Sequence, residues 1–200
     1  KPRPVVPRHD TYEIDERIAA DGDIVTDLDS EVASTLVRDI FDKEKFDSVA
    51  ICFLHSYLNS IHERALSDII SALYPGMPIT CSSDVAREFR EYERASTTTL
   101  AAYVQPVVAG YISRFSEELA RRGFQGKFSI MQSNGGRMPA AAITKNAITA
   151  LFSGPAAGVV GAIRGKGNTP YPDLITLDMG GTSTDVALVN NDQAELAPMT

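Results

Sequence analysis

The stretch Leu174–Val189, which reads LITLDMGGTSTDVALV, places the strongest constraint on the fold. Its two apolar arms, Leu174–Leu177 and Val186–Val189, each predict a short buried strand. Between the arms lies a polar centre with a glycine pair, which can turn at positive φ and lets a ligand approach the backbone closely. Successive N–H groups of such a turn can converge on anionic oxygens. The sequence therefore predicts a phosphate-binding hairpin.

The polar centre also supplies side chains suited to phosphate and metal. Asp178 ends the first arm and is the candidate Mg²⁺ ligand, directly or through water, because Mg²⁺ usually takes one or two carboxylates plus phosphate oxygens. A local hydrogen bond within the turn is an equally good interpretation of Asp185. The candidate nucleotide- and phosphate-binding residues are Gly180, Gly181, Thr182, Ser183 and Asp185.

Two common phosphate-binding motifs are excluded at this turn. No Gly-Lys-Ser/Thr follows, as a Walker A loop requires, and a second β-rich run stands where a GxGxxG motif would open a helix. A surface hairpin with a Gly-Gly turn is the plain alternative. The two acids that bracket GGTST between apolar arms favour phosphate binding over that alternative.

The composition is that of a globular α/β protein and limits its partners. Of the 200 residues, 44% are hydrophobic and 22% charged, which provides ample core. A net charge of -7 argues against nucleic acid as a partner. No apolar run reaches the length of a membrane span, and no signal peptide is recognisable. Cys52 and Cys81 lie in apolar runs, which predicts buried free thiols and a cytoplasmic protein.

The first part of the chain alternates strands and helices. A strand, a helix and a second strand between residues 46 and 81 predict a right-handed βαβ crossover. The expected elements are a hairpin in Thr11–Asp27 with its turn at Asp21-Gly22, a helix over Ser30–Phe41 capped by Asp29, a strand Phe46–Leu54, a helix capped by Ser60, a strand Pro78–Cys81, and a long helix from about Ser96 to Arg122.

The second part leads into the glycine hairpin. Small residues in a helix that begins near Pro155 predict close packing against another backbone. The other expected elements are a strand Phe128–Gln132, a short helix Pro139–Lys145, an extended run Ile148–Phe152, a linker Gly165–Pro172, and a turn at Asn190-Asn191 into a final strand.

Three further groups of residues are weaker candidates. The candidate substrate-cleft residues Gln132, Asn134, Gly135 and Gly136 follow a predicted strand, where α/β sheets bind ligands, although an ordinary turn fits them equally well. The charges of Arg87–Arg94 predict a salt-bridge ladder on a helix surface rather than a cleft. His55 has no visible carboxylate partner, so a structural role is favoured over a general base, and His62 has still less support.

Four phrases occur in an order that resembles the hydantoinase/oxoprolinase family. Its members include the A subunit of ATP-dependent N-methylhydantoinase, 5-oxoprolinase and the acetone carboxylase β subunit. The resemblance extends from about Tyr12 to Val189 and does not separate these members. The phrases are EFREYERASTT at Glu88–Thr98, MQSNGG at Met131–Gly136, SGPAAGVVGA at Ser153–Ala162 and DMGGTSTDV at Asp178–Val186.

The resemblance implies an α/β fold of the actin-like ATPase (ribonuclease-H-like) type, present in part, with a mixed sheet and flanking helices. Residues 1–45 would be an N-terminal extended segment, hairpin and helix. Residues 46–165 would be the later part of the N-terminal half with its connecting helix, and residues 173–200 would open the second half. The family's first phosphate hairpin has no copy upstream of Tyr12, and the chain has no initiator Met. We therefore expect an internal segment of a longer protein.

The activity that the resemblance implies is ATP-dependent opening of a small cyclic amide, of the hydantoin or 5-oxoproline type. Phosphorylation of the amide oxygen would create a leaving group, and the protein would position the reactants and stabilise charge. By motif match Asp178 is the candidate catalytic residue, the cofactors are ATP and Mg²⁺, and the partner is a second subunit or B-type domain. A ligase of the acetone carboxylase β-subunit type and a non-catalytic folding or interaction module remain alternatives.

Overall fold

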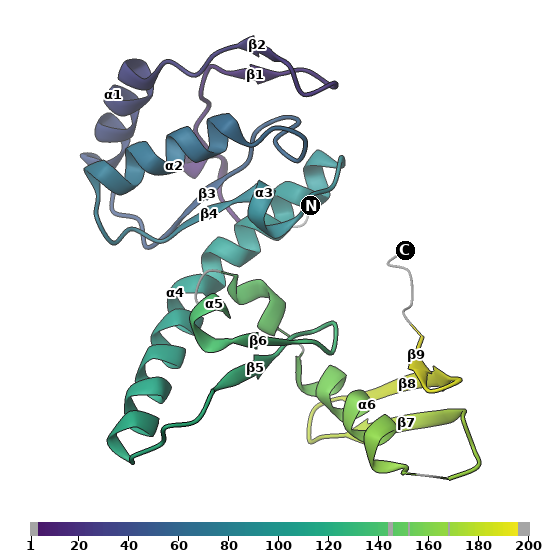
Figure 1. The fold of residues 1–200 in the computed structure, drawn as a ribbon. Coiled ribbons are helices and arrows are strands. Elements are labelled where there is room, and N and C mark those ends of the chain that lie inside the picture. Colours follow the sequence, from purple (N-terminus) through teal and green to yellow (C-terminus); the bar gives the residue numbers. More distant parts are fainter. Residues whose placement is uncertain (1–3, 144–145, 152, 168, 196–200) are drawn as a thin grey trace. The chain divides into compact units, whose positions relative to one another are not determined.

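The computed structural model describes residues 4–143, 146–151, 153–167 and 169–195. The chain has a mixed α/β fold and divides into two compact units (Figure 1). Unit 1 contains residues 1–122 and 144–148, and unit 2 contains residues 123–143 and 149–200. The assignment of residues 1–45, 46–165 and 173–200 to parts of an actin-like fold stays a prediction.

Unit 1 opens with the predicted hairpin and helix. After the short 3-10 helix η1 (Arg8–Asp10), strands β1 (Arg17–Ile18) and β2 (Ile24–Thr26) pair antiparallel. Gly22 sits in the turn at φ 94°, a conformation that favours glycine. Helix α1 (Ser30–Phe41) begins where the sequence predicts, because the carboxylate of Asp29 accepts hydrogen bonds from the N–H groups of its first turn.

The predicted strand–helix–strand unit is confirmed, with a shorter first strand. Strands β3 (Val49–Ile51) and β4 (Ile79–Cys81) pair in parallel, and α2 (Ile61–Leu73) connects them. Strand β3 ends early because both backbone groups of Phe53 bond to side chains of other elements instead of a neighbouring strand. The cap of α2 differs from the prediction: the Asn59 side-chain oxygen accepts the Ile61 N–H, and Ser60 makes no side-chain cap bond.

The hydrophobic core of unit 1 lies between the β3–β4 pair and the helices α1 and α2. The two helices pack against each other, and Phe41 stacks on Tyr74 with ring centroids 4.3 Å apart. Burial of these apolar side chains is the main favourable contribution to the stability of the unit. The fully buried members of the core are Leu28, Ala33, Val37, Ile51, Leu66, Ile70 and Cys81.

A short helix α3 (Ser82–Val85) and a long helix α4 (Glu91–Arg121) complete the main elements of unit 1. Helix α4 begins five residues before the predicted Ser96. Its first turn carries Glu91 and Glu93, and acidic side chains are favourable at the positive end of a helix. Across the described ranges, no helix, α4 included, has the length and hydropathy needed to cross a membrane.

Unit 2 begins with a hairpin of β5 (Ser129–Met131) and β6 (Arg137–Pro139), followed by α5 (Ala140–Ile143). The strand β6 is not predicted by the sequence. The predicted extended run Ile148–Phe152 is wrong, because residues Ala147–Ala150 form the 3-10 helix η2, and Phe152 lies outside the described residues. Thr144 and Lys145, the end of the predicted short helix, also lie outside them.

The rest of unit 2 is a helix on a three-stranded antiparallel sheet (Figure 1). Helix α6 (Ser153–Gly165) precedes β7 (Leu174–Met179), β8 (Thr184–Asn190) and β9 (Gln193–Ala194), paired in the order β7-β8-β9. The helix, the glycine hairpin and the turn into a last strand are thus confirmed. Helix α6 packs against β7, but its glycines do not show the predicted close approach to another backbone: a Cβ at Gly158 would meet only the Asp178 side chain, at 3.5 Å, and one at Gly161 would meet nothing within 4 Å.

Candidate functional site

The predicted glycine hairpin is present, and its turn is tight. Asp178 pairs with Asp185 and Met179 with Thr184 in the β7–β8 ladder. The N–H of Gly180 donates to the carbonyl of Ser183 over 2.9 Å and closes the turn. Because this N–H is used inside the turn, the amides left to bind a ligand are those of Gly181, Thr182 and Ser183, for which we find no partner within the described chain.

The glycine pair is not explained by backbone conformation. Neither Gly180 nor Gly181 has a positive φ, so that part of the prediction is wrong. A Cβ at Gly181 would meet nothing within 4 Å, and one at Gly180 would lie 3.7 Å from the Ser183 oxygen, an ordinary contact. Neither strain nor packing therefore requires glycine here. The missing Cβ atoms leave the backbone of the turn open to close approach by a ligand.

The two aspartates of the hairpin lie directly opposite each other on one face of the sheet. Both are exposed, and neither carboxylate has an ion pair or hydrogen bond to any described residue. The local hydrogen bond considered for Asp185 is thus not observed. A Cβ at Gly158 would lie 3.5 Å from Oδ2 of Asp178, so this carboxylate faces α6. Like charges directly opposite each other destabilise a ladder, and a cation between them would remove that cost.

The donor set fits Mg²⁺ bound together with phosphate rather than an ion held by protein alone. The described residues contain no group of three or more His, Cys, Asp or Glu side chains placed to hold a metal. Mg²⁺ needs no such cage, because one or two carboxylates, phosphate oxygens and water complete its octahedral shell. Asp178 and Asp185 can supply the carboxylates.

Helix α6 runs antiparallel to β7. Lys166, just after the end of α6, forms an ion pair with Asp192, whose N–H donates to Pro172 before the start of β7. Gly158, two turns earlier in α6, lies beside Asp178 near the end of β7. The amino end of α6, with its partial positive charge, is therefore directed toward the same end of the sheet as the glycine turn.

The two arms are buried on one face only, which corrects the prediction. On the face toward α6, Val189 is buried and Leu174 is half-buried. The opposite face is apolar but exposed, because none of the described residues covers it, and Ile175 there is 70% exposed. The exposed apolar side chains of this face are Ile175, Leu177, Met179, Val186 and Leu188.

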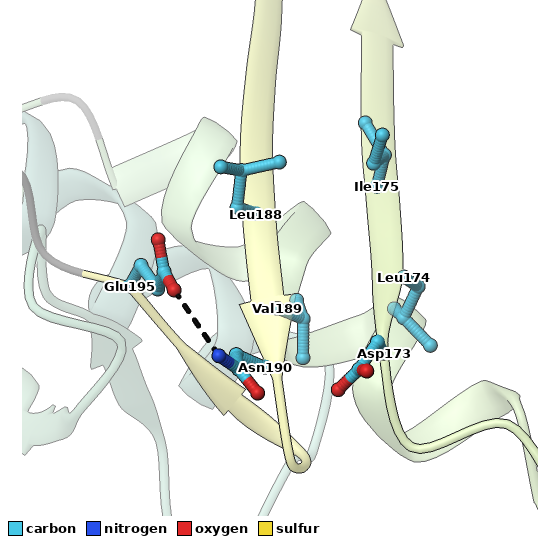
Figure 2. A pocket seen from close by; sticks show the side chains of 7 residues that line it. All are labelled: Asp173, Leu174, Ile175, Leu188, Val189, Asn190 and Glu195. Carbon is cyan, nitrogen blue, oxygen red and sulfur yellow. Dashed lines mark hydrogen bonds between the residues drawn. The ribbon is translucent and has the colours of Figure 1, made fainter.

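A hollow of about 420 Å³ lies at the other end of this sheet (Figure 2). It is lined by residues 173–175 and 188–190 and by Glu195, whose carboxylate accepts a 3.5 Å hydrogen bond from Asn190. The glycine turn does not belong to it. The candidate phosphate site is thus an exposed turn and not an enclosed pocket of the described chain.

The candidate substrate-cleft residues form the turn between β5 and β6. The Gln132 N–H donates to the Gly136 carbonyl over 2.9 Å, the Gly136 N–H donates to the Asn134 side chain over 2.8 Å, and Gly135 takes φ 81°. These bonds are those of a tight hairpin turn. A role of Gln132, Asn134, Gly135 and Gly136 in binding a substrate stays a prediction.

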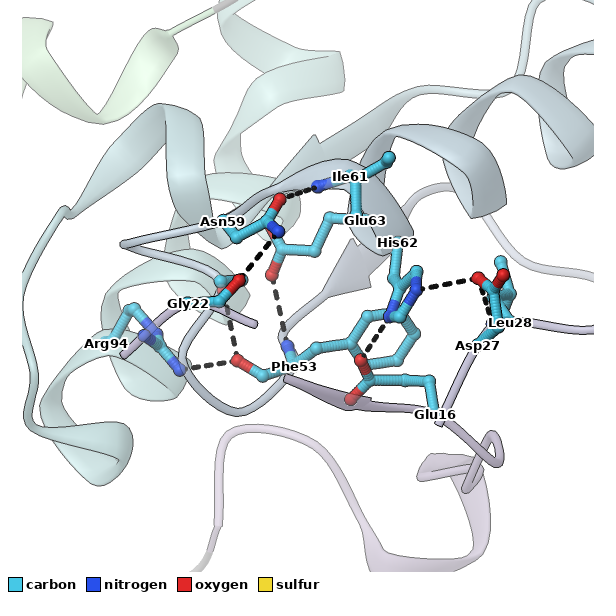
Figure 3. A network of polar contacts seen from close by, with 11 residues as sticks. Glu16, Gly22, Asp27, Leu28, Phe53, Asn59, Ile61, His62, Glu63 and Arg94 are labelled. Atoms are coloured by element: carbon cyan, nitrogen blue, oxygen red, sulfur yellow. Dashed lines mark hydrogen bonds and ion pairs between the residues drawn. The ribbon is translucent and has the colours of Figure 1, made fainter. Parts of the chain in front are cut away.

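Sequence reasoning missed a buried polar network beyond the ends of β3 and β4 (Figure 3). Glu63 is fully buried: one carboxylate oxygen accepts from the Phe53 N–H at 3.1 Å and the Ser82 hydroxyl at 2.6 Å, and the other accepts from the Ser83 N–H at 3.0 Å. Arg94, also fully buried, donates to the carbonyl oxygens of Phe53 at 2.6 Å and Glu88 at 3.3 Å. The predicted surface ladder is therefore wrong for Arg94.

His62 and Cys81 lie around the same network. Both ring nitrogens of the buried His62 face carboxylates, Glu16 at 2.7 Å and Asp27 at 3.1 Å (Figure 3). Burial, together with the negative charge of Glu63, raises the pKa of the Cys81 thiol to about 11. Both cysteines are free thiols, as predicted, but only Cys81 is buried, whereas Cys52 is half-buried.

Helical spacing was the feature that could have revealed the network. Glu63 precedes the buried Leu66 by three residues and Ile70 by seven, which places all three on one face of α2. Arg94 shares the buried face of α4 with Thr98 and Ala101 for the same reason.

Comparison with known proteins agrees with the geometry over most of the chain. An uncharacterised protein of Methanocaldococcus jannaschii is 38% identical over 192 residues, which are 96% of this chain and 28% of that protein. The crystal structure of the ATP-dependent caprolactamase from Pseudomonas jessenii has a TM-score of 0.82 at 35% identity over 92% of this chain and 26% of its own. The nucleotide-free structure of an acetone carboxylase, from work on ATP-dependent acetone carboxylation, has a TM-score of 0.81 at 31% identity, over 96% of this chain and 27% of its own.

The chain thus spans a little over a quarter of the length of these relatives. The family profile described as "Hydantoinase/oxoprolinase N-terminal region" matches residues 2–74, which contain α1, α2 and β3. The profile described as "Hydantoinase/oxoprolinase" matches residues 94–200, from Arg94 through the glycine hairpin. With both regions matched in this order, the chain belongs to the hydantoinase/oxoprolinase family.

Proposed function

We propose that this chain is part of a cytoplasmic, ATP-dependent enzyme that opens a cyclic amide of the hydantoin or 5-oxoproline type. Its relatives include proteins named 5-oxoprolinase, from Arabidopsis thaliana and Saccharomyces cerevisiae, and caprolactamase subunit alpha, from Pseudomonas jessenii. The observation that carries the proposal is the glycine turn, where two unpaired aspartates and three free amides lie together at one end of a sheet. Under this proposal the fold is the later part of the N-terminal half of an actin-like ATPase, followed by the opening hairpin of its second half.

In this proposal the turn binds the phosphates of ATP. The free N–H groups of Gly181, Thr182 and Ser183 and the hydroxyls beside them donate to phosphate oxygens, and the missing Cβ of Gly181 leaves room for those oxygens to approach. Asp178 orients Mg²⁺, with Asp185 opposite it. ATP would supply the phosphoryl group for the amide oxygen; water would then add to the activated carbon, the ring C–N bond would break with the nitrogen leaving as the amine, and a second water would hydrolyse the resulting acyl phosphate to carboxylate and phosphate.

The test is Asp178→Asn in the full-length protein assembled with its partner subunit or B-type domain. We expect ATP turnover and ring opening to fall together, on the order of 100-fold, because the amide orients Mg²⁺ poorly. Asp173→Asn is the matched control: it lies at the far end of the same sheet, and its side-chain oxygen can still accept from the Asn191 N–H. Equal turnover by the Asp178→Asn variant and the wild type would refute the proposed site.

A second candidate function is an ATP-dependent ligase of the acetone carboxylase type, favoured by the likeness to the acetone carboxylase beta subunit of Xanthobacter autotrophicus at 31% identity. It would use the same turn with a different acceptor for the phosphoryl group. ATP consumption that depends on acetone and bicarbonate, without ring opening, would favour the ligase. Absence of ATP–Mg²⁺ binding by the full-length protein would favour a non-catalytic folding or interaction module.

A further inference from the structure

The loop that follows β3 holds a histidine in the left-handed conformation, which few residues other than glycine adopt. His55 has φ 57°, in the left-handed region, where a residue with a Cβ is uncommon and costs free energy relative to glycine. The loop lies beyond the carboxyl end of a parallel strand, the edge at which open α/β sheets bind ligands. Backbone strain of this kind is often found at functional sites, which makes the His55 side chain a candidate for binding.

Two buried side chains of opposite charge, Glu63 and Arg94, hydrogen-bond to the backbone of this loop (Figure 3). The Phe53 N–H donates to the Glu63 carboxylate, and the Phe53 carbonyl accepts from the Arg94 guanidinium and from the Ser56 hydroxyl. Neither Glu63 nor Arg94 forms an ion pair with a described residue, so their charges are stabilised mainly by peptide groups and hydroxyls. Buried charges are a weak source of stability, and their retention here points to a requirement for one loop conformation.

The same network continues to the accessible side of the loop. The Arg94 guanidinium lies 5.4 Å from the centre of the Tyr57 ring, and the Tyr57 hydroxyl lies 3.5 Å from Nδ1 of His55. His55 and Tyr57 are half-exposed, whereas Arg94 is fully buried. Within the described ranges Nε2 of His55 has no hydrogen-bond partner. Nδ1 of His55 therefore faces the Tyr57 hydroxyl, and Nε2 is left to bond to a ligand.

We propose that His55 and Tyr57 form a substrate-binding edge, at which Nε2 of His55 bonds to the amide group of the uncharged cyclic substrate. An imidazole nitrogen can donate to the amide oxygen or accept from the amide N–H, so Nε2 of His55 can bond to either group of the ring amide. Glu63 and Arg94 are positioning residues that fix the loop. This inference rests on the proposed ring substrate but not on the glycine turn.

The experiment uses His55→Gly and His55→Asn in the full-length protein with its partner. Both replacements tolerate the left-handed conformation, so the loop is retained while the imidazole is removed. His9→Asn, at an exposed histidine of the N-terminal segment, is the matched control. The probes are 5-oxoproline, caprolactam and hydantoin for the ring and a fluorescent ATP analogue for the nucleotide, with equilibrium dialysis measuring ring binding without ATP.

We expect both variants to bind the ring about 10-fold more weakly and to raise its KM by a similar factor, the size of one lost hydrogen bond. Binding of the ATP analogue and the urea unfolding midpoint should not fall. Unchanged ring binding in both variants would overturn the inference, and so would failure of the wild type to bind any of the three rings. Ring binding by the wild type without ATP-dependent turnover, lost in both variants, would refute the proposed function and support the binding edge.

Discussion

The glycine turn of β7–β8 and the loop after β3 differ in the burial and bonding of their charged side chains. At the turn, two carboxylates lie exposed and opposite each other without a partner in the described chain. At the strand end, Glu63 and Arg94 are fully buried and hydrogen-bonded to the backbone. The first arrangement costs little and stays open to a ligand, whereas the second is costly to bury and rigid once formed. Under the two proposals above, the exposed groups of the turn would meet the phosphates directly, whereas the buried Glu63 and Arg94 would only fix the loop that carries His55 and Tyr57.

Removal of the Glu63 carboxylate should have the largest effect on the stability of unit 1. Glu63→Ala leaves the N–H groups of Phe53 and Ser83 without their acceptor. It also removes the negative charge that opposes the buried positive charge of Arg94. We expect the free energy of unfolding, measured in urea, to fall by about 3–5 kcal/mol. Glu63→Gln, which keeps an acceptor oxygen, should lose clearly less. A loss below about 1 kcal/mol for the alanine variant would show that the network is not a rigid support.

Loss of the Arg94 guanidinium should have the next largest effect. Arg94→Met keeps much of the apolar stem but removes the donors to the carbonyl oxygens of Phe53 and Glu88. We expect unfolding in urea to become easier by about 2–3 kcal/mol, since these bonds involve a charged donor. Arg90→Met is the matched control, because Arg90 is exposed and its ion pair with Glu93 is long at 3.7 Å. Equal losses in the two variants would contradict a special role for Arg94.

The reactivity of the Cys81 thiol tests whether water is excluded from the end of β4. Its pKa is raised to about 11 by burial first and by the charge of Glu63 second. At pH 8 this lowers the thiolate fraction by about 100-fold relative to an ordinary cysteine, so iodoacetamide should react correspondingly slowly in the folded protein.

Because the pKa of Cys81 is raised in the folded state, the stability that this group contributes is complete below about pH 9 and falls as the pH rises toward 11. Cys81→Ser should lack that decline, and rapid alkylation at pH 8 would contradict a buried thiol.

The two regions also differ in how far the sequence predicts them. The turn is encoded by sixteen adjacent residues, Leu174–Val189, so the hairpin and its register follow from local patterns. The network joins Phe53, Glu63, Ser82 and Arg94, which come from four segments, and only tertiary packing brings them together. Strand β6 was missed for a related reason, since Arg137–Pro139 carries a proline and no alternation. The exposed apolar face of β7–β8 could not be predicted, because a buried-strand pattern does not specify what covers it.

The smallest effect should be of opposite sign and concerns the hairpin aspartates. Without Mg²⁺ or nucleotide, Asp178→Asn removes the repulsion from Asp185 across the ladder and should stabilise the hairpin by about 0.2–1 kcal/mol. Hydrogen exchange at the β7 and β8 amides measures this local free energy, and the gain should shrink at high salt because exposed charges are screened. A loss of stability would mean that the carboxylate already has a partner in the protein. The turn and the strand end would then no longer differ, and the exposed aspartates would have to be treated as structural.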